Sequence, residues 1–291
     1  MNKFLQLLET RQVLLADGAT GTNLHNMGLK PGIPTEDLVM DDPGMLLELA
    51  KSFVKAGADI ILTCTFGGTR LRMKDSKYVD RVSEVNTRAV ELARQAAAGE
   101  EDVLVAGSMG PTGQLMKPYG PLSAEEVYAS FKEQASALVK GGVDLLVLET
   151  HFAYDEADAA FRAARDVSDL PIVISFSYDR GTRTMMGVKP ADMIRHYREM
   201  GATLVGANCG TTLENMEKVA QEYAQAEPGF PLWIKPNAGL PRMEGESTVF
   251  NVSPEQMAGF ASKYIALGAR VVGGCCGSTP AHIAAMAAGV K

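Results

Sequence analysis

The stretch 144-DLLVLE-149 decides the fold class of this chain. Its centre is apolar without interruption, which is typical of a parallel β-strand buried on both faces. The stretch 123-SAEEVYASFKEQASALVKGG-142 lies directly before it and carries apolar residues at helical spacing. Ser123 and Glu126 form a capping-box pair at its start. The two stretches together predict a helix that packs beside a buried parallel strand.

Seven more apolar, β-branched runs follow the same pattern, separated by helical stretches of roughly 10 to 20 residues. The predicted strands are 13-VLLAD-17, 59-DIILTC-64, 103-VLVAG-107, 144-DLLVLE-149, 171-PIVISFS-177, 203-TLVGANC-209, 231-PLWIKP-236 and 270-RVVGGC-275. Eight strands, each followed by a helix, predict an α/β fold, a single (β/α)₈ TIM barrel. An open doubly wound sheet is the alternative, but no G-x-G-x-x-G turn follows the first strand.

The composition is that of a globular enzyme. The 291 residues are 46% hydrophobic and 22% charged, and no linker or low-complexity segment divides them, so we expect one domain over residues 1–291. Lysine and arginine number 28 against 35 acidic residues, a net charge of −7. No basic tract is present, which argues against a nucleic-acid partner.

Targeting signals are also missing from the sequence. The N-terminal stretch MNKFLQLLETRQ lacks the apolar core of a signal peptide, and no apolar run reaches the 18 or more residues of a membrane span. Four cysteines in a chain of this length, two of them adjacent, do not form a disulfide framework. We therefore expect a cytoplasmic protein with reduced thiols and no membrane contact.

Several polar residues and cysteines lie at or just past the C-terminal ends of the predicted strands. They are Asp17, Cys64, Glu149, Cys209, Asn237, Cys275 and Cys276. In a TIM barrel the active site is built at the C-terminal ends of the strands. The sequence therefore predicts that these residues face one mouth.

Three of the cysteines predict a catalytic zinc site. Cys209 closes the sixth strand, and Cys275 and Cys276 close the eighth, where the flanking glycines let the strand break so that both sulfurs can face one metal. Three thiolates leave one tetrahedral position of zinc open for an incoming thiol. Small buried residues in a glycine-rich turn are the plain alternative. A closed structural zinc site, with Cys64 or His151 as fourth ligand, is another.

Motifs along nearly the whole chain resemble the homocysteine S-methyltransferase family, zinc-dependent barrels that methylate homocysteine to methionine. They are 17-DGATGT-22, 65-TFGGTR-70, 110-GPTG-113, 149-ET-150, 206-GANCG-210, 236-PNAG-239 and 273-GGCCGSTP-280. The last motif is the most specific, because a GGCCG strand end paired with an upstream N-C is rare elsewhere. Within the family, the chain is most similar to the homocysteine-binding domain of cobalamin-dependent methionine synthase.

The resemblance implies zinc ligation by Cys209, Cys275 and Cys276. It also implies that Asp17 and Glu149 bind the amino group of a homocysteine-like substrate, as two carboxylates suit an ammonium. From the residues alone, the alternative for Asp17 is a turn-capping aspartate before Gly18, and the alternative for Glu149 is a pair with a neighbouring basic side chain. Asn237 is a candidate substrate contact or a turn former.

Two positions depart from the family pattern. Cys64 stands in 63-TCTF-66, where many relatives read T-N-T-F, and His151 stands where relatives usually carry an apolar or aromatic residue. Cys64 is either a small residue beside the pocket or an extra thiol near zinc that changes the substrate. His151 is either a solvated or hydrogen-bonded histidine or a substrate contact and proton carrier. We keep both as candidate substrate-binding residues.

The methyl donor is the open question in the sequence. The likeness to the cobalamin-dependent enzyme favours methylcobalamin carried by a separate corrinoid protein. Small onium donors (S-methylmethionine, S-adenosylmethionine or a betaine) and an anaerobic demethylation system are the alternatives. A betaine would favour an aromatic cage, and the aromatic content is only 7%. The loop 110-GPTGQLMKPYGPL-122 is long and rich in glycine and proline, so we expect it to form a rim or lid.

Two other classes of protein compete with a methyltransferase. A Schiff-base aldolase would use Lys235, on the predicted seventh strand, as its nucleophile. A non-catalytic zinc-binding protein would close the metal shell with four protein ligands. The aldolase leaves the three cysteines without a role.

Overall fold

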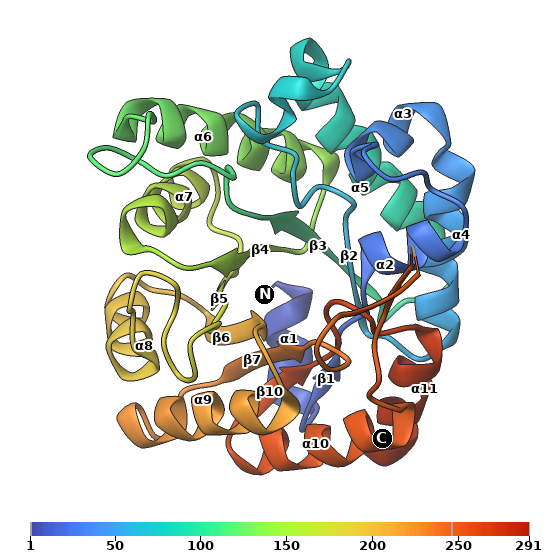
Figure 1. Cartoon of the computed structure of the whole chain (residues 1–291), viewed down its shortest axis with the longest axis vertical. Helices are drawn as coiled ribbons and strands as arrows, with labels where there is room; N and C mark the ends of the chain where they lie inside the picture. Colours follow the sequence, from blue (N-terminus) through green and yellow to red (C-terminus); the bar gives the residue numbers. More distant parts are fainter. Residues whose placement is uncertain (1, 246, 291) are drawn as a thin grey trace.

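The computed structural model describes residues 2–245 and 247–290. Eight parallel strands lie side by side in the order β1-β10-β7-β6-β5-β4-β3-β2. A parallel bridge between Ala16 and Ile60 joins the two ends of this sheet. The strands therefore form a barrel surrounded by helices (Figure 1), and the predicted TIM barrel is confirmed.

The barrel strands are β1 Leu14–Leu15, β2 Ile60–Leu62, β3 Leu104–Met109, β4 Leu145–His151, β5 Ile172–Phe176, β6 Leu204–Cys209, β7 Leu232–Pro236 and β10 Ala269–Val272. The α-helices are α1 Lys3–Thr10, α2 Thr20–Asn26, α3 Leu38–Asp41, α4 Pro43–Lys55, α5 Val82–Ala96, α6 Ala124–Gly141, α7 Tyr154–Val167, α8 Pro190–Glu199, α9 Leu213–Ala226, α10 Pro254–Ala266 and α11 Pro280–Val290. Short 3₁₀ turns occupy Thr35–Asp37, Arg72–Asp75 and Val79–Arg81.

Alternation along the strands separates two apolar layers, because successive side chains of a strand point to opposite faces. One layer fills the barrel interior and includes Leu145, Val147 and Trp233. The other lies between the barrel and the helices and includes Leu146 and Leu148. Both faces of each strand are buried, which is why the runs are apolar throughout.

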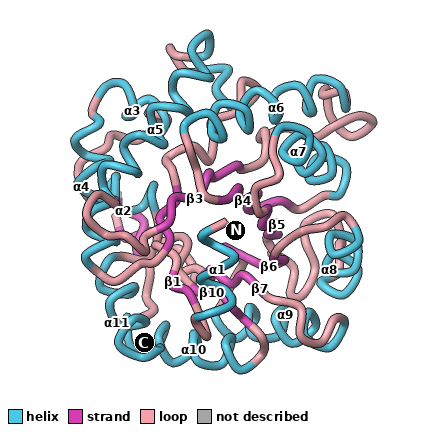
Figure 2. Tube along the Cα trace, turned by 180° about the vertical axis from the view of Figure 1, so that it is seen from behind, coloured by secondary structure: helices cyan, strands magenta, loops and turns pink. Residues whose placement is uncertain are grey.

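The first helix closes the bottom of the barrel. Phe4 and Leu7 of α1 belong to the interior apolar cluster. Figure 2 shows the molecule from this side, with α1 lying across the end of the barrel. The opposite end, where the strands finish, is left to the loops, so the mouth lies there.

The predicted capping box of α6 is confirmed, with Ser123 and Glu126 each bonded to the other's backbone N–H, and Gly142 ends the helix in a left-handed conformation. Several strands are shorter than predicted, and β10 ends at Val272, three residues before Cys275. No helix among the described residues is long and apolar enough to cross a membrane.

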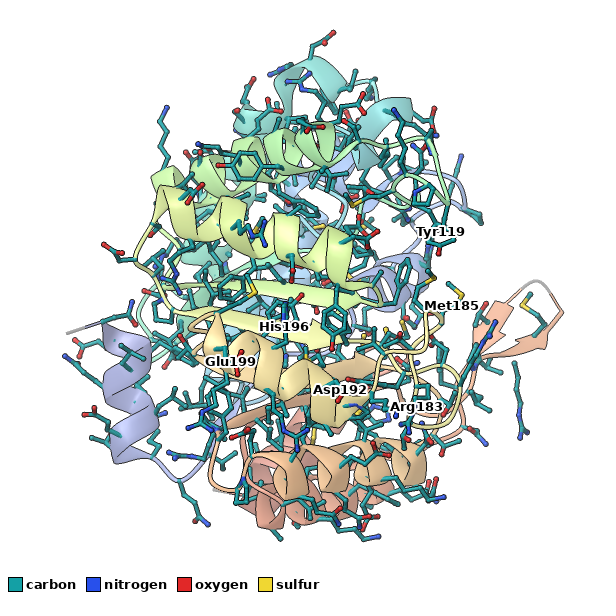
Figure 3. All side chains as sticks on the ribbon, turned by 90° about the vertical axis from the view of Figure 1, so that its left-hand side faces the viewer. Tyr119, Arg183, Met185, Asp192, His196 and Glu199 are labelled. Atoms are coloured by element: carbon teal, nitrogen blue, oxygen red, sulfur yellow. The ribbon has the colours of Figure 1, made fainter. Side chains whose placement is uncertain are left out.

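An antiparallel hairpin that the sequence did not reveal lies between β7 and α10. It consists of β8 Arg242–Glu244 and β9 Ser247–Val249. Figure 3 shows the hairpin projecting from the mouth side, opposite α1. It therefore adds to the rim of the mouth.

Candidate functional site

A cavity of about 240 Å³ opens at the mouth of the barrel. Its wall includes the strand-end residues Asp17, Cys64, Glu149, Cys209, Cys275 and Cys276. Thr35, Glu36, Phe66, Ser108, Thr150 and Lys235 also line it. The mouth thus brings together six of the eight site residues predicted from the sequence.

The floor of the cavity is set by strand periodicity. Ser108, Glu149 and Lys235 each lie two residues beyond an apolar residue of the barrel interior, namely Ala106, Val147 and Trp233. They therefore point into the barrel from one level above the apolar interior. Polar side chains at this level are buried, so each needs a partner within the mouth.

The three cysteines form one cluster. Their Sγ atoms all lie within 4.8 Å of one another, and no other histidine, cysteine or acidic group of the described residues joins them. The Cys209 sulfur lies 3.8 Å from that of Cys276 and 2.9 Å from that of Cys275. Two sulfur ligands of a tetrahedral zinc lie about 3.8 Å apart, given Zn–S bonds of about 2.3 Å. The Cys209–Cys276 distance therefore matches that of two ligands of one metal, and the Cys209–Cys275 distance is shorter than this spacing.

The break after β10 turns both adjacent cysteines toward the cavity. The N–H of Cys275 donates to the Pro236 carbonyl, and the Cys276 carbonyl accepts from Ala238 N–H. Gly277 has φ of 79°, and a Cβ there would lie 2.1 Å from the Phe250 ring. The glycine-rich turn predicted from 273-GGCCG-277 is thus required by space as well as by conformation.

Cys209 reaches the same point through an unusual backbone. Its φ is 56°, and Thr150 at the end of β4 has φ of 65°. These are the two residues other than glycine with positive φ in the described chain. Such a conformation costs about 1–3 kcal/mol for a residue with a side chain, and such residues cluster at functional sites. Both line the cavity.

Contacts among the three thiols shift their pKa values in opposite directions. Hydrogen bonds from Cys209 and Cys275 lower the pKa of Cys276, and the same contacts to Cys275 and Cys276 raise the pKa of Cys209. The contacts among the three sulfurs therefore favour ionisation at Cys276 over Cys209. A metal cation would replace the thiol protons, because thiolate is the form of cysteine that binds metals.

Asp17 and Lys235 form a buried ion pair in the cavity wall. The Lys235 Nζ lies 2.8 Å from Asp17 Oδ1, with side chains only 3% and 5% exposed. The other oxygen, Oδ2, accepts from Leu62 N–H at 2.7 Å. Burial opposes the ammonium, yet the charges of Asp17 and Glu149 raise the pKa of Lys235. Lys235 is thus a bound cation, which does not suit the neutral amine nucleophile of a Schiff-base aldolase.

Glu149 lies across the same cavity. Its Oε1 accepts from Ser108 Oγ at 2.5 Å, and no described residue donates to its second oxygen. Burial raises its pKa to about 7, with Lys235 partly opposing the shift. This carboxyl group is available to a cationic ligand, whereas both oxygens of Asp17 already accept hydrogen bonds.

Cys64 lies in the cavity wall but outside the sulfur cluster. Its thiol donates to the Thr35 carbonyl at 3.5 Å, and burial, with help from Glu36, raises the pKa of the thiol. Glu36 is itself buried and accepts from Gly67 N–H at 2.6 Å. Cys64 therefore remains a neutral thiol beside the pocket and is not a fourth ligand of the cluster.

His151 does not reach the cavity. The left-handed conformation of Thr150 and the register shift between Leu148 and His151 interrupt the alternation of β4. The imidazole is fully buried, with its ring centroid 5.9 Å from that of Phe131 and 6.5 Å from that of Phe176. The expected substrate contact and proton carrier therefore lies in the layer between barrel and helices.

Burial also lowers the pKa of His151 to about 4. The unfolded chain takes up this proton near pH 6.5, whereas the folded chain does so only near pH 4. We therefore expect His151 to cost the protein up to about 3 kcal/mol of unfolding free energy as the pH falls from about 6.5 to 4. Urea unfolding of the wild type and His151→Leu across this range measures the difference. An identical pH dependence in both proteins would contradict it.

The side chain of Asn237 bonds to the backbone next to Cys209, outside the cavity. Its Nδ2 donates to the Gly210 carbonyl at 3.1 Å, next to Cys209, and the side chain does not line the cavity. Its neighbour Ala238 bonds to Cys276. The structure thus places Asn237 between the two cysteine segments and not in contact with the cavity.

Three residues were not assigned these site roles from the sequence, of which Lys235 and Glu36 line the cavity and Asn208 bonds to Thr150 and Cys275 behind it. Lys235 was considered only as a nucleophile, and Glu36 and Asn208 were not singled out. Lys235 and Asp17 are 218 positions apart, so no local pattern pairs them. A lysine at the end of an otherwise apolar strand was the available signal, because a buried cation needs a buried anion.

Fold and site together define a class of protein, a TIM barrel with a cluster of three cysteine sulfurs at its mouth. Comparison with known families agrees. Residues 14–290 match the family model described as homocysteine S-methyltransferase, and the chain belongs to that family.

Individual relatives are similar over the whole chain. The methionine synthase of Mycobacterium leprae is 27% identical over 98% of this chain, and that of Mycobacterium tuberculosis is 26% identical over 97%. The chain spans about a quarter (25%) of the length of each. The metallated homocysteine methyltransferase MmuM from Escherichia coli has a TM-score of 0.84, with 26% identity and 99% of both chains covered.

Proposed function

We propose that this protein is a zinc-dependent S-methyltransferase that activates homocysteine and produces methionine. The observation that carries the proposal is the sulfur cluster of Cys209, Cys275 and Cys276, which has no fourth protein ligand among the described residues. Zinc bound there would keep an incoming thiol ionised near neutral pH and leave its sulfur nucleophilic. The thiolate attacks the methyl carbon, a carbon–sulfur bond forms, and the electron pair of the broken bond leaves with the donor.

Glu149 is the best candidate for binding the amino group of homocysteine. Its second oxygen is available in the cavity, and an ammonium would ionise the carboxyl group and pair with it. Asp17 contributes mainly through its pairing with Lys235. The two carboxyl groups therefore have different roles in this proposal. Glu149 binds the amino group of the substrate, and Asp17 forms the ion pair with Lys235.

The proposed methyl donor is methylcobalamin on a separate corrinoid protein. Relatives that share this domain carry about three times as much additional chain. The exposed large apolar side chains of the described residues also all lie in the connections that follow the barrel strands, at the mouth side, with Met243 on the hairpin strand β8: Ile33, Leu115, Tyr119, Met185, Met186, Leu240 and Met243. Figure 3 shows Tyr119 and Met185 on the side of the projecting hairpin. An apolar rim of this kind suits a partner protein over the mouth.

We expect Glu149→Gln to raise the KM for homocysteine by about 10- to 100-fold, because a hydrogen bond to a charged group is worth about 1.5–3 kcal/mol. The kcat should change less. Rates of methionine formation measure the KM for homocysteine and the kcat. Comparing the rates with methylcobalamin, free or on a corrinoid protein, and with S-methylmethionine identifies the donor. The matched control is Glu156→Gln, a buried carboxyl group outside the cavity that accepts from Thr112. No methionine from any donor would contradict the proposed function.

A further inference from the structure

Asn208 lies at the centre of the site but touches neither the cavity nor solvent. It precedes Cys209 on β6 and is fully buried. Its side chain is within hydrogen-bond distance of three strand ends. It contacts Thr150 of β4, Ser175 of β5 and Cys275 beyond β10. No feature of the sequence assigned this asparagine a role.

The Asn208 side-chain amide makes four hydrogen bonds. The Oδ1 atom accepts from Thr150 N–H at 2.8 Å and from Ser175 Oγ at 2.7 Å. The Nδ2 atom donates to Thr150 Oγ1 at 2.7 Å and to Cys275 Sγ at 3.7 Å. An amide has two donor hydrogens and an oxygen with two lone pairs, so every position is filled.

The orientation of the amide is determined by Thr150. A backbone N–H can only donate, so the atom that faces it must be Oδ1. One Nδ2 hydrogen is then taken by Thr150 Oγ1, and the other is directed at the Cys275 sulfur. A flipped amide would place its NH₂ group against the Thr150 N–H, two donors facing each other. The N–H···S contact therefore follows from the surrounding bonds.

We propose that Asn208 is a positioning residue for the metal-binding sulfur of Cys275. Its N–H···S bond fixes the direction of this sulfur and withdraws electron density from it. Its two bonds to Thr150 hold the strained end of β4 beside the available oxygen of Glu149. One amide thus links the position of the sulfur cluster to the position of the carboxyl group proposed to bind the substrate.

The inference rests on the proposed zinc site. It predicts in addition that Asn208 affects the metal affinity and the absorption spectrum of that site. An outer hydrogen-bond partner of a metal ligand typically contributes 10- to 100-fold to metal affinity. Within the same metal site, the sulfur of Cys275 should become more electron-rich when the donor is removed. The sulfur-to-metal charge-transfer absorption should then move to lower energy.

The test compares the wild type with Asn208→Leu, which has similar volume and no donor. We expect the zinc affinity, measured by chelator competition, to fall by about 10-fold or more. With Co²⁺ in place of zinc, the charge-transfer band should move to longer wavelength. Asn208→Asp, which puts a carboxylate oxygen against the sulfur, should lose more affinity than Asn208→Leu.

The matched control is Asn86→Leu, which removes another fully buried asparagine amide, one that bonds to Gly68 and Val82. It should lose folding stability but keep the wild-type zinc affinity and cobalt spectrum. Unchanged affinity and spectrum in folded Asn208→Leu would overturn the role of Asn208. Lack of zinc binding by the wild type would instead overturn the proposed function.

Discussion

Cys276→Ser should lower zinc affinity by more than about 100-fold, since even an outer partner of a ligand typically contributes 10- to 100-fold. Cys276 is one of the three cysteines whose sulfurs lie close enough together to hold one metal. A serine hydroxyl does not ionise near neutral pH and cannot replace the thiolate. Methyl transfer should fall with the metal. Zinc content after dialysis and initial rates of methionine formation measure both effects.

Cys64→Ser is the matched control for this substitution. Cys64 also lies in the cavity wall, yet it is outside the sulfur cluster. The variant should therefore retain about one zinc per chain. Retention of zinc by Cys276→Ser, or its loss in Cys64→Ser, would contradict the assignment of the three ligands.

Lys235→Met should destabilise the protein by about 3–5 kcal/mol, because removing one partner of a buried ion pair leaves the other charge uncompensated. Asp17 would keep only the Leu62 N–H as a hydrogen-bond donor to its buried carboxylate. The double variant Asp17→Asn/Lys235→Met should recover much of the loss. Urea unfolding of the wild type, the two single variants and the double variant gives the coupling energy.

Arg81→Met provides the surface comparison. Arg81, at the end of the 3₁₀ turn Val79–Arg81, pairs with Glu84 in the first turn of α5, and about half of each side chain is exposed. Water already solvates both charges, so the loss of this pair should change stability little. Equal effects of Arg81→Met and Lys235→Met would contradict the view that the lysine is needed for its buried charge.

The barrel could be predicted because the burial pattern of each strand is visible in a short stretch of sequence. The run 144-DLLVLE-149 is apolar on both faces, and the strand β4 that it forms contacts the interior with one set of side chains and the helices with the other. The hairpin β8–β9 could not be predicted in the same way. Arg242, Met243 and Thr248 are all exposed, Met243 by 67%, so these positions carry no alternating burial pattern.

The sulfur cluster could also be predicted, because parallel strands bring their ends to one mouth wherever they lie in the sequence. His151 was kept as a candidate because it departs from the family pattern, and strand alternation alone would place it inside the barrel with Glu149, two residues earlier. The left-handed turn at Thr150 reverses its direction. The N–H of Thr150 donates to the Asn208 amide, 58 positions away, so this contact has no local pattern in the sequence.

The most direct test of the proposed mechanism is zinc X-ray absorption spectroscopy of the protein with and without homocysteine. We expect three sulfur neighbours from Cys209, Cys275 and Cys276 in the free protein. Addition of homocysteine should give a fourth sulfur neighbour in place of a lighter atom. A zinc shell that already holds four protein ligands, or one that homocysteine leaves unchanged, would contradict an open site that activates a thiol.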